Sequence, residues 1–105
     1  MAVSKLPSVA GGVNPFTPIN ATIVSGGFFA AGNVLIVNVH FRTTTSGARL
    51  HGMPSIKNAP MPLLLYDWAS DTAHPGYVNA DGHVVVPAIL GANHEYLAMG
   101  VFVKA

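Results

Sequence analysis

Glycine and proline interrupt this sequence along its whole length, and no segment between them keeps a helical period over three turns. The chain has eleven glycines and eight prolines in 105 residues. The segments between them are rich in Val, Ile and Phe, which favour the pleated surface of a β-sheet. We therefore expect an all-β fold, an antiparallel β-sandwich or jelly-roll-like barrel of about seven or eight short strands.

The strand pattern is clearest near the start of the apolar region. The stretch "ATIVSGGFFAAGNVLIVNVHFR" predicts two strands, 21–29 and 33–42, joined around residues 30–33. Asp81 and Gly82 lie between two apolar runs and predict a tight hairpin, because glycine tolerates the positive φ that such turns require. The other expected elements are a strand at 63–68, a polar loop at 69–76 and a last strand at 95–104.

The length is sufficient for one domain. Residues 1–20 contain three prolines and show no periodicity, so they predict an irregular N-terminal arm before a β-sandwich head domain at 21–105. This arm is either a frayed terminus or a segment whose apolar residues dock on a neighbour. Those apolar residues are Leu6, Val13, Phe16 and Ile19.

Composition excludes several classes of function. Only 9% of the residues are charged, against about 25% in an ordinary soluble domain, which indicates a large protein–protein interface. The five basic residues are scattered, and no apolar run approaches the roughly 18–20 residues of a membrane span, so we expect neither nucleic-acid binding nor membrane insertion. There is no cysteine. The N-terminus has no continuous apolar stretch, so we expect synthesis in the cytoplasm without a signal peptide.

The last expected strand is apolar on both faces, although a surface sheet usually leaves one face in water. Its two alternating sets are Leu97, Met99, Val101 and Val103, and then Tyr96, Ala98, Gly100 and Phe102. The small residues Ala98 and Gly100 predict close approach, so the second set is expected to form the interface of a cyclic oligomer, a homotrimer. Asn38 and His40 are placed near the symmetry axis, where polar groups of three copies meet. The alternative is that His40 is a hydrogen-bonded, partly buried histidine within its own chain.

Catalytic and metal-binding patterns are weak. The five histidines lie in different expected elements without metal-ligand spacing, and no phosphate-binding loop, dinucleotide fingerprint or nucleophile elbow is present. We therefore expect no protein-encoded metal site, and the signal for catalysis is weak. Asp67 and Asp71 are the one conceivable carboxylate pair for a hydrolase, although solvated loop positions explain them more simply.

The stretch "YDWASDTAHPGY" gathers aromatic and polar side chains in one segment. An aromatic ring that covers the C–H groups of a sugar, with polar neighbours that fix its hydroxyls, is typical of a saccharide site. The alternative is that Trp68 and Tyr66 plug the end of the sandwich. The candidate ligand-binding residues are Asp67, Trp68, Asp71, His74 and Tyr77, with Arg49 and His51 from the loop "GARLHG" as further partners.

The order of these segments, with "GNVLIVNVHF", "YVNADGHVVV" and the final "YLAMGVFVKA", resembles the C-terminal head domains of bacteriophage tail-fibre and baseplate receptor-binding proteins, of which those of lactococcal phages are the best known. The resemblance covers residues 25–105. It implies a homotrimeric head at the tip of a virion tail that contacts other tail proteins and binds host cell-surface saccharide, without a cofactor or enzyme activity. Such proteins usually have an N-terminal shoulder or neck, whereas this chain has only its 20-residue arm.

Two other functions remain open at this stage. One is a ligand-free structural component of a virion, such as a fibre cap. The other is a small polysaccharide hydrolase that uses the loop between Asp67 and Asp71.

Overall fold

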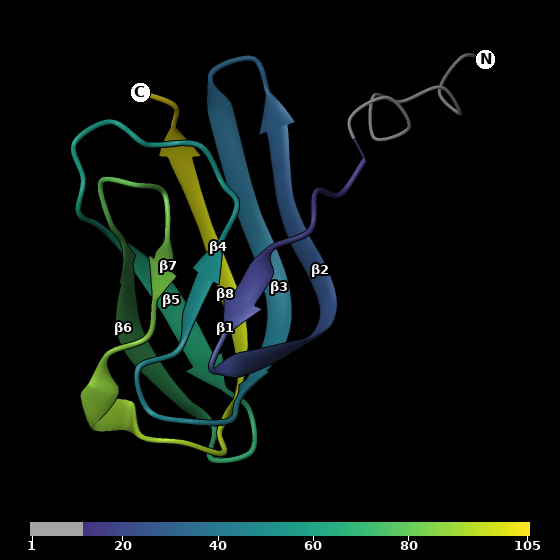
Figure 1. Ribbon diagram of the computed structural model, residues 1–105, viewed down its shortest axis with the longest axis vertical. Helices are drawn as coiled ribbons and strands as arrows, with labels where there is room; N and C mark the ends of the chain where they lie inside the picture. The colour runs from purple at the N-terminus through teal and green to yellow at the C-terminus, as the bar shows by residue number, and fades with distance from the viewer. Residues whose placement is uncertain (1–11) are drawn as a thin grey trace.

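The computed structural model describes residues 12–105 and shows one antiparallel sheet (Figure 1). Its strands are β1 (Thr17–Ile19), β2 (Ala21–Ala31), β3 (Val34–Thr43), β4 (Arg49–His51), β5 (Met61–Asp67), β6 (Thr72–Val78), β7 (Val84–Val85) and β8 (Glu95–Val103). Among the described residues the only helical element is the 3-10 turn η2 (Ala88–Leu90). The expectation of an all-β antiparallel fold is therefore confirmed.

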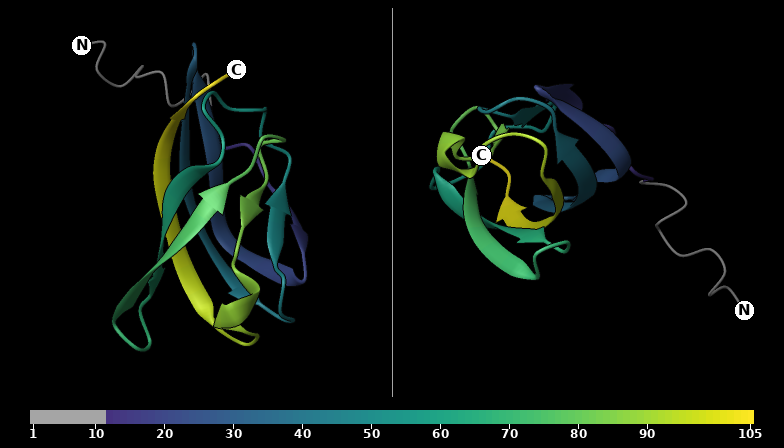
Figure 2. Two further views of the ribbon diagram at one scale, coloured as in Figure 1. Left: turned by 90° about the vertical axis from the view of Figure 1, so that its left-hand side faces the viewer. Right: turned by 90° about the horizontal axis from the view of Figure 1, so that it is seen from below.

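The sheet curls until its two edges meet. The strand order is β1-β4-β7-β6-β5-β8-β3-β2, so β1 and β2 lie at opposite edges. Asn14, just before β1, forms a β-bridge with Phe28 of β2, and β1 itself pairs with β4. Residues 14–19 thus contact β2 on one side and β4 on the other. This segment nearly closes the barrel, as the view from below shows (Figure 2).

The expectation that residues 1–20 form an irregular arm outside the barrel is wrong for residues 14–19. Phe16 is only 5% exposed and packs against Phe28, with ring centroids 5.1 Å apart. Residues 14–19 therefore belong to the barrel, because the open edges of β2 and β4 need backbone partners. Phe16 docks on its own chain, and the expected contact of Leu6 lies outside the described residues.

Alternate residues of β3, β5 and β8 supply much of the interior, and buried residues of the other strands and of the connections complete it. Phe41 of β3 lies 5.8 Å from Tyr96 of β8, measured between ring centroids, and both side chains are buried. Ala98 and Phe102 are 1% and 4% exposed within the single chain. The expectation that the face of Tyr96, Ala98, Gly100 and Phe102 meets a second copy is therefore wrong, since this face forms the core of its own barrel.

The core of its own barrel leaves no room for a side chain at Gly100. A Cβ at this position would lie 2.8 Å from Cζ of Phe102 and 2.9 Å from Cδ1 of Leu63. Those distances are shorter than carbon atoms tolerate in a packed interior. The missing side chain therefore makes room for core residues, and not for the close approach of a partner.

Two hairpins show where local sequence signals succeed and fail. The hairpin at Asp81 and Gly82 is confirmed, with Gly82 at φ +82° and its amide donating to the carbonyl of Asn79. By contrast, the expected loop over 69–76 is too long, because β6 begins at Thr72 and pairs along the whole of β5, which leaves only a short turn. Pro75 is tolerated in β6 because the short β7 pairs only with the end of that strand.

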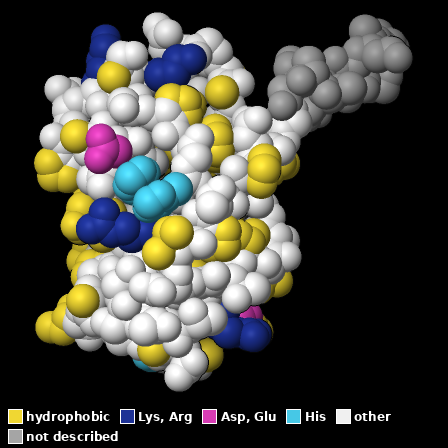
Figure 3. Space-filling view, viewed as in Figure 1, with side chains coloured by type: hydrophobic (Ala, Val, Ile, Leu, Met, Phe, Trp, Pro, Cys, Tyr) yellow, Lys and Arg dark blue, Asp and Glu magenta, His cyan; other side chains and the backbone are white. Residues whose placement is uncertain are grey.

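On the surface that faces the viewer in Figure 3, over β1, β4 and β7, charged side chains lie at separate points with uncharged groups between them. Apolar and uncharged groups cover most of this surface, as the composition requires.

Candidate functional site

The tip of the β5–β6 hairpin presents the single tryptophan of the chain to solvent. The turn runs from Trp68 to Asp71, and Trp68 is 54% exposed. Tyr66, at the end of β5, donates a hydrogen bond from its hydroxyl to the carboxylate of Asp71, which raises the pKa of the tyrosine. Trp68 therefore does not plug the barrel.

Asp67 fixes the shape of this tip from beneath. Its carboxylate is buried and accepts hydrogen bonds from Nδ1 of His94 at 3.0 Å and from the amides of Ala69 and Ser70 at 3.2 and 3.3 Å. Burial raises the pKa of Asp67, but the hydrogen bonds from His94 and Ser70 outweigh it, so the pKa lies below its usual value. The carboxylate is thus a charged anchor of the turn.

His94 is a site residue that sequence reasoning missed. It lies just before β8, 27 positions from Asp67, and nothing in the local sequence links the two residues. The side chain of His94 is 45% exposed, and its ring stacks on Tyr96 with centroids 6.0 Å apart. The bond from its Nδ1 leaves Nε2 as the ring nitrogen that is free to meet a ligand.

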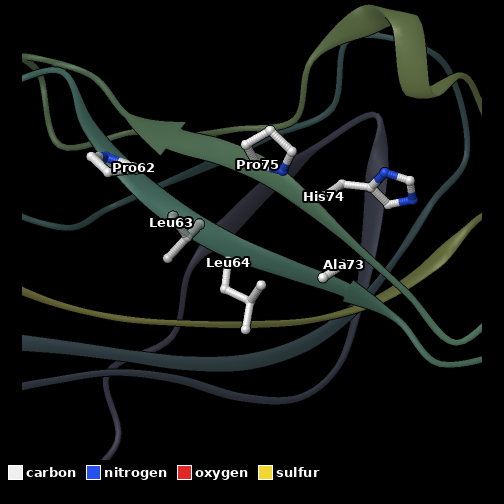
Figure 4. A pocket seen from close by; sticks show the side chains of 6 residues that line it. All are labelled: Pro62, Leu63, Leu64, Ala73, His74 and Pro75. Carbon is white, nitrogen blue, oxygen red and sulfur yellow. The ribbon is translucent and has the colours of Figure 1, made fainter.

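His74 lies near the same end of the barrel. Its ring meets Tyr96 edge-on, with centroids 6.3 Å apart, so His74 and His94 contact one tyrosine. His74 also borders a hollow of about 350 Å³ between β5 and β6, but its ring points away from Leu64 and the other lining side chains (Figure 4). The rest of that lining is Pro62, Leu63, Leu64, Ala73 and Pro75. This hollow is therefore apolar, without convergent polar groups.

The other three candidate residues lie elsewhere on the barrel. Tyr77 and Arg49 are both in register with Val85, from β6 and β4 respectively. Tyr77 is five residues along β6 from Thr72, about 17 Å at roughly 3.3 Å per residue. The candidate set therefore divides into a tip group and a second group of Tyr77, Arg49 and His51, and one sugar ring cannot contact both.

The second group contains an unusual pair of histidines. His51 and His83 stack with ring centroids 3.6 Å apart and planes inclined by 8°. Figure 3 shows histidine side chains gathered on the face over β1, β4 and β7. Nε2 of His51 and Nδ1 of His83 are buried without a hydrogen-bond partner. Burial, and then the charges of His83 and Arg49, lower the pKa of His51, while Asp81 opposes them.

This pair predicts a loss of stability in mild acid. A lowered folded pKa means that the unfolded chain binds the proton more readily, so stability is full above pH 6.5 and falls as the pH drops below it. We expect the melting temperature to be lower at pH 5 than at pH 8. His51→Phe, which keeps a flat ring against His83, should reduce that difference. An unchanged difference in calorimetry would show that His51 is not responsible.

The titratable groups do not assemble into a metal centre. Within residues 12–105, no three His, Asp or Glu side chains come together in a way that could hold a metal ion. In stacked rings such as His51 and His83 the in-plane lone pairs run side by side and do not converge on one point. Asp67 and Asp71 both accept hydrogen bonds from protein groups, so they do not form an open carboxylate pair.

A separate exposed surface lies on the outside of β3, β5 and β8. Seven apolar side chains, each 38–67% exposed, form what we term the outer apolar face: Val34, Ile36, Leu64, Leu97, Met99, Val101 and Val103. Asn38 lies exposed among them. At one end His40 Nε2 lies 2.7 Å from Glu95, to which Arg42 also donates at 3.3 Å. These bonds, with that of His40 foremost, lower the pKa of Glu95.

Two expectations about polar interface groups have different outcomes. The ring of His40 already has a partner within its own chain, Glu95, so it does not require polar groups from other copies. Contact of Asn38 with other copies stays a prediction.

Comparison with protein-family models, with curated proteins and with solved structures found no match to this chain. Over residues 12–105, no helix has the length and apolar character needed to cross a membrane. The functional conclusions below therefore rest on the geometry of the hairpin tip and of the outer apolar face.

Proposed function

We propose that this chain is a non-enzymatic head domain of the phage receptor-binding type, which recognises host cell-surface saccharide and is displayed as a homotrimer at the tip of a virion tail, attached to other tail proteins. The proposal rests on one observation above all. Trp68 is 54% exposed on a tight hairpin whose neighbours carry carboxylate, phenol and imidazole groups.

The tip has the chemistry that a sugar ring requires. The face of an indole covers the apolar C–H groups of a pyranose, while hydroxyls need hydrogen-bond partners at the edge. Asp71 has acceptor capacity beyond the bond from Tyr66, and His94 offers its second ring nitrogen. Trp68 therefore supplies the platform, and these polar groups supply orientation.

The tip is also held in shape before any ligand arrives. Asp67 ties two turn amides and His94 together, so little additional ordering is needed on binding. A single shallow contact is nonetheless weak because it buries little area. Three copies at one tip raise the apparent affinity for a multivalent surface by about 10²–10⁴ without any new contact.

Trp68→Ala tests the proposal. We expect at least a tenfold loss of binding to a glycan array or to host cell walls, with little change in melting temperature because the side chain is exposed. Ile89→Ala is the matched control, since Ile89 is 92% exposed on the turn η2 and should not matter.

Three outcomes would overturn the proposal. If the wild-type chain binds no saccharide, the site has no such ligand. If binding survives Trp68→Ala, the platform lies elsewhere. If the chain releases reducing ends from polysaccharide, it is a hydrolase.

The second candidate is a ligand-free structural component of a virion, such as a fibre cap. The outer apolar face favours it, because assembly requires such a face and saccharide binding does not. Absence of glycan binding together with stable association would support this candidate. No comparable observation favours the hydrolase, since Asp67 and Asp71 are both engaged in the hairpin.

A further inference from the structure

The outer apolar face has the size of the apolar part of a protein interface. At their exposed fractions of 38–67%, its seven side chains present roughly 600 Å² of apolar surface, the upper end of what a soluble monomer usually leaves exposed. A standard interface buries about 800 Å² per partner, of which about 65% is apolar between identical subunits. The face therefore provides the whole apolar share of such an interface.

The relief of this face includes both projections and a hollow. Met99 and Val101 of β8 are 54% and 67% exposed. Beside them lies an open hollow of about 400 Å³ bordered by Ile36, Asn38 and Leu64. The projecting side chains and the hollow are both apolar. Projecting side chains of one copy can therefore pack into the hollow of another, since each copy supplies both parts.

Charge also points to an uncharged partner surface. The middle of the outer apolar face, around Ile36, Leu64 and Met99, is bordered by the uncharged Asn38. Charged groups lie at its two ends: Lys57 borders a hollow with Val34 and Val101, and Arg42 neutralises the Glu95 carboxylate. A charged partner would lose hydration at the middle of the face without gaining an opposite charge. A second copy of this chain presents a matching apolar surface and meets this condition.

We infer that copies of this chain associate through the outer apolar face, with β8 at the centre of the contact. This inference does not depend on saccharide binding at Trp68, which lies at the hairpin tip. It replaces the buried face of Tyr96 and Phe102 as the place where copies meet.

The test compares matched charge substitutions by light scattering coupled to size exclusion. The wild-type chain should have a mass well above the 10.9 kDa of one chain, about three times that mass for the proposed homotrimer. Met99→Glu and Val101→Lys should each weaken association at least tenfold, because either sign of charge would be buried without a partner. Ile89→Glu adds the same charge to a more exposed apolar residue off this face and should leave the mass unchanged.

Circular dichroism should show that both variants stay folded, and a folded Met99→Glu monomer should still bind soluble saccharide at single-site affinity. A wild-type monomer at high micromolar concentration would overturn the inference and assign the face to another molecule. Unchanged association in folded Met99→Glu and Val101→Lys would overturn it as well. If Trp68→Ala loses glycan binding but still associates, that result would support the inference, because it separates association from saccharide binding.

Discussion

Gly100→Arg is expected to unfold the barrel, and not merely to separate its copies. A Cβ at this position already approaches Phe102 and Leu63 too closely, and the longer side chain would carry a charge into the core. Overpacking costs about 1–3 kcal/mol, and an unpaired buried charge costs several more. The sum is on the order of 5 kcal/mol, comparable with the whole stability of a small domain.

Met99→Arg is the matched control for this prediction. It places the same side chain on the neighbouring residue, which faces outward and is 54% exposed. Urea unfolding followed by circular dichroism should give a cooperative transition for Met99→Arg and none for Gly100→Arg. Equal midpoints for Gly100→Arg and the wild-type chain would mean that Gly100 does not face the core.

Asp67→Asn is expected to produce the second largest loss. The amide is isosteric, but it removes the charge that His94 and the amides of Ala69 and Ser70 contact. Hydrogen bonds to a charged group contribute about 1.5–3 kcal/mol. We expect a loss of about 2–3 kcal/mol, which for a domain of this size lowers the melting temperature by roughly 10–20 °C.

Asp67→Asn should also change how the free energy of unfolding depends on pH in acid. The folded pKa of Asp67 lies below its usual value of 3.8, so its contribution is present above pH 3.8 and is lost as the pH falls through the folded pKa. Glu95 behaves alike from 4.5 downward. Asp67→Asn should flatten the slope below pH 4, whereas Glu95→Gln should flatten the part that begins nearer 4.5. Parallel slopes in wild-type and Asp67→Asn protein would contradict this assignment.

Local chemistry predicted most of the strands but could not orient them. Residues in β2, β3 and β8 follow from their apolar alternation, and the turn at Gly82 follows from its need for a positive φ. In β8, however, both alternating sets are apolar, so hydrophobicity could not decide which one faces the core. A choice of face depends on register with β3 and β5, which is a long-range property.

The candidate site was predicted in part for the same reason. Trp68 and Asp71 were found because they are close in sequence, and the structure keeps them together at one tip. His94 was missed because its bond to Asp67 comes from the pairing of β8 with β5. Arg49 was grouped with the tip by composition, whereas the register places it beside Val85.

The pairing of β3 with β8 has a consequence for how the protein is made. Val34 pairs with Val103, so the middle of the sheet joins parts of the chain separated by roughly 70 residues. At a synthesis rate of about 5–20 residues per second, that separation corresponds to roughly 3–14 seconds. Throughout that interval β3 lacks β8, its partner on the side away from β2, while β4 to β7 are still being added. A nascent chain therefore exposes the apolar side chains on both sides of β3 until β8 has been made.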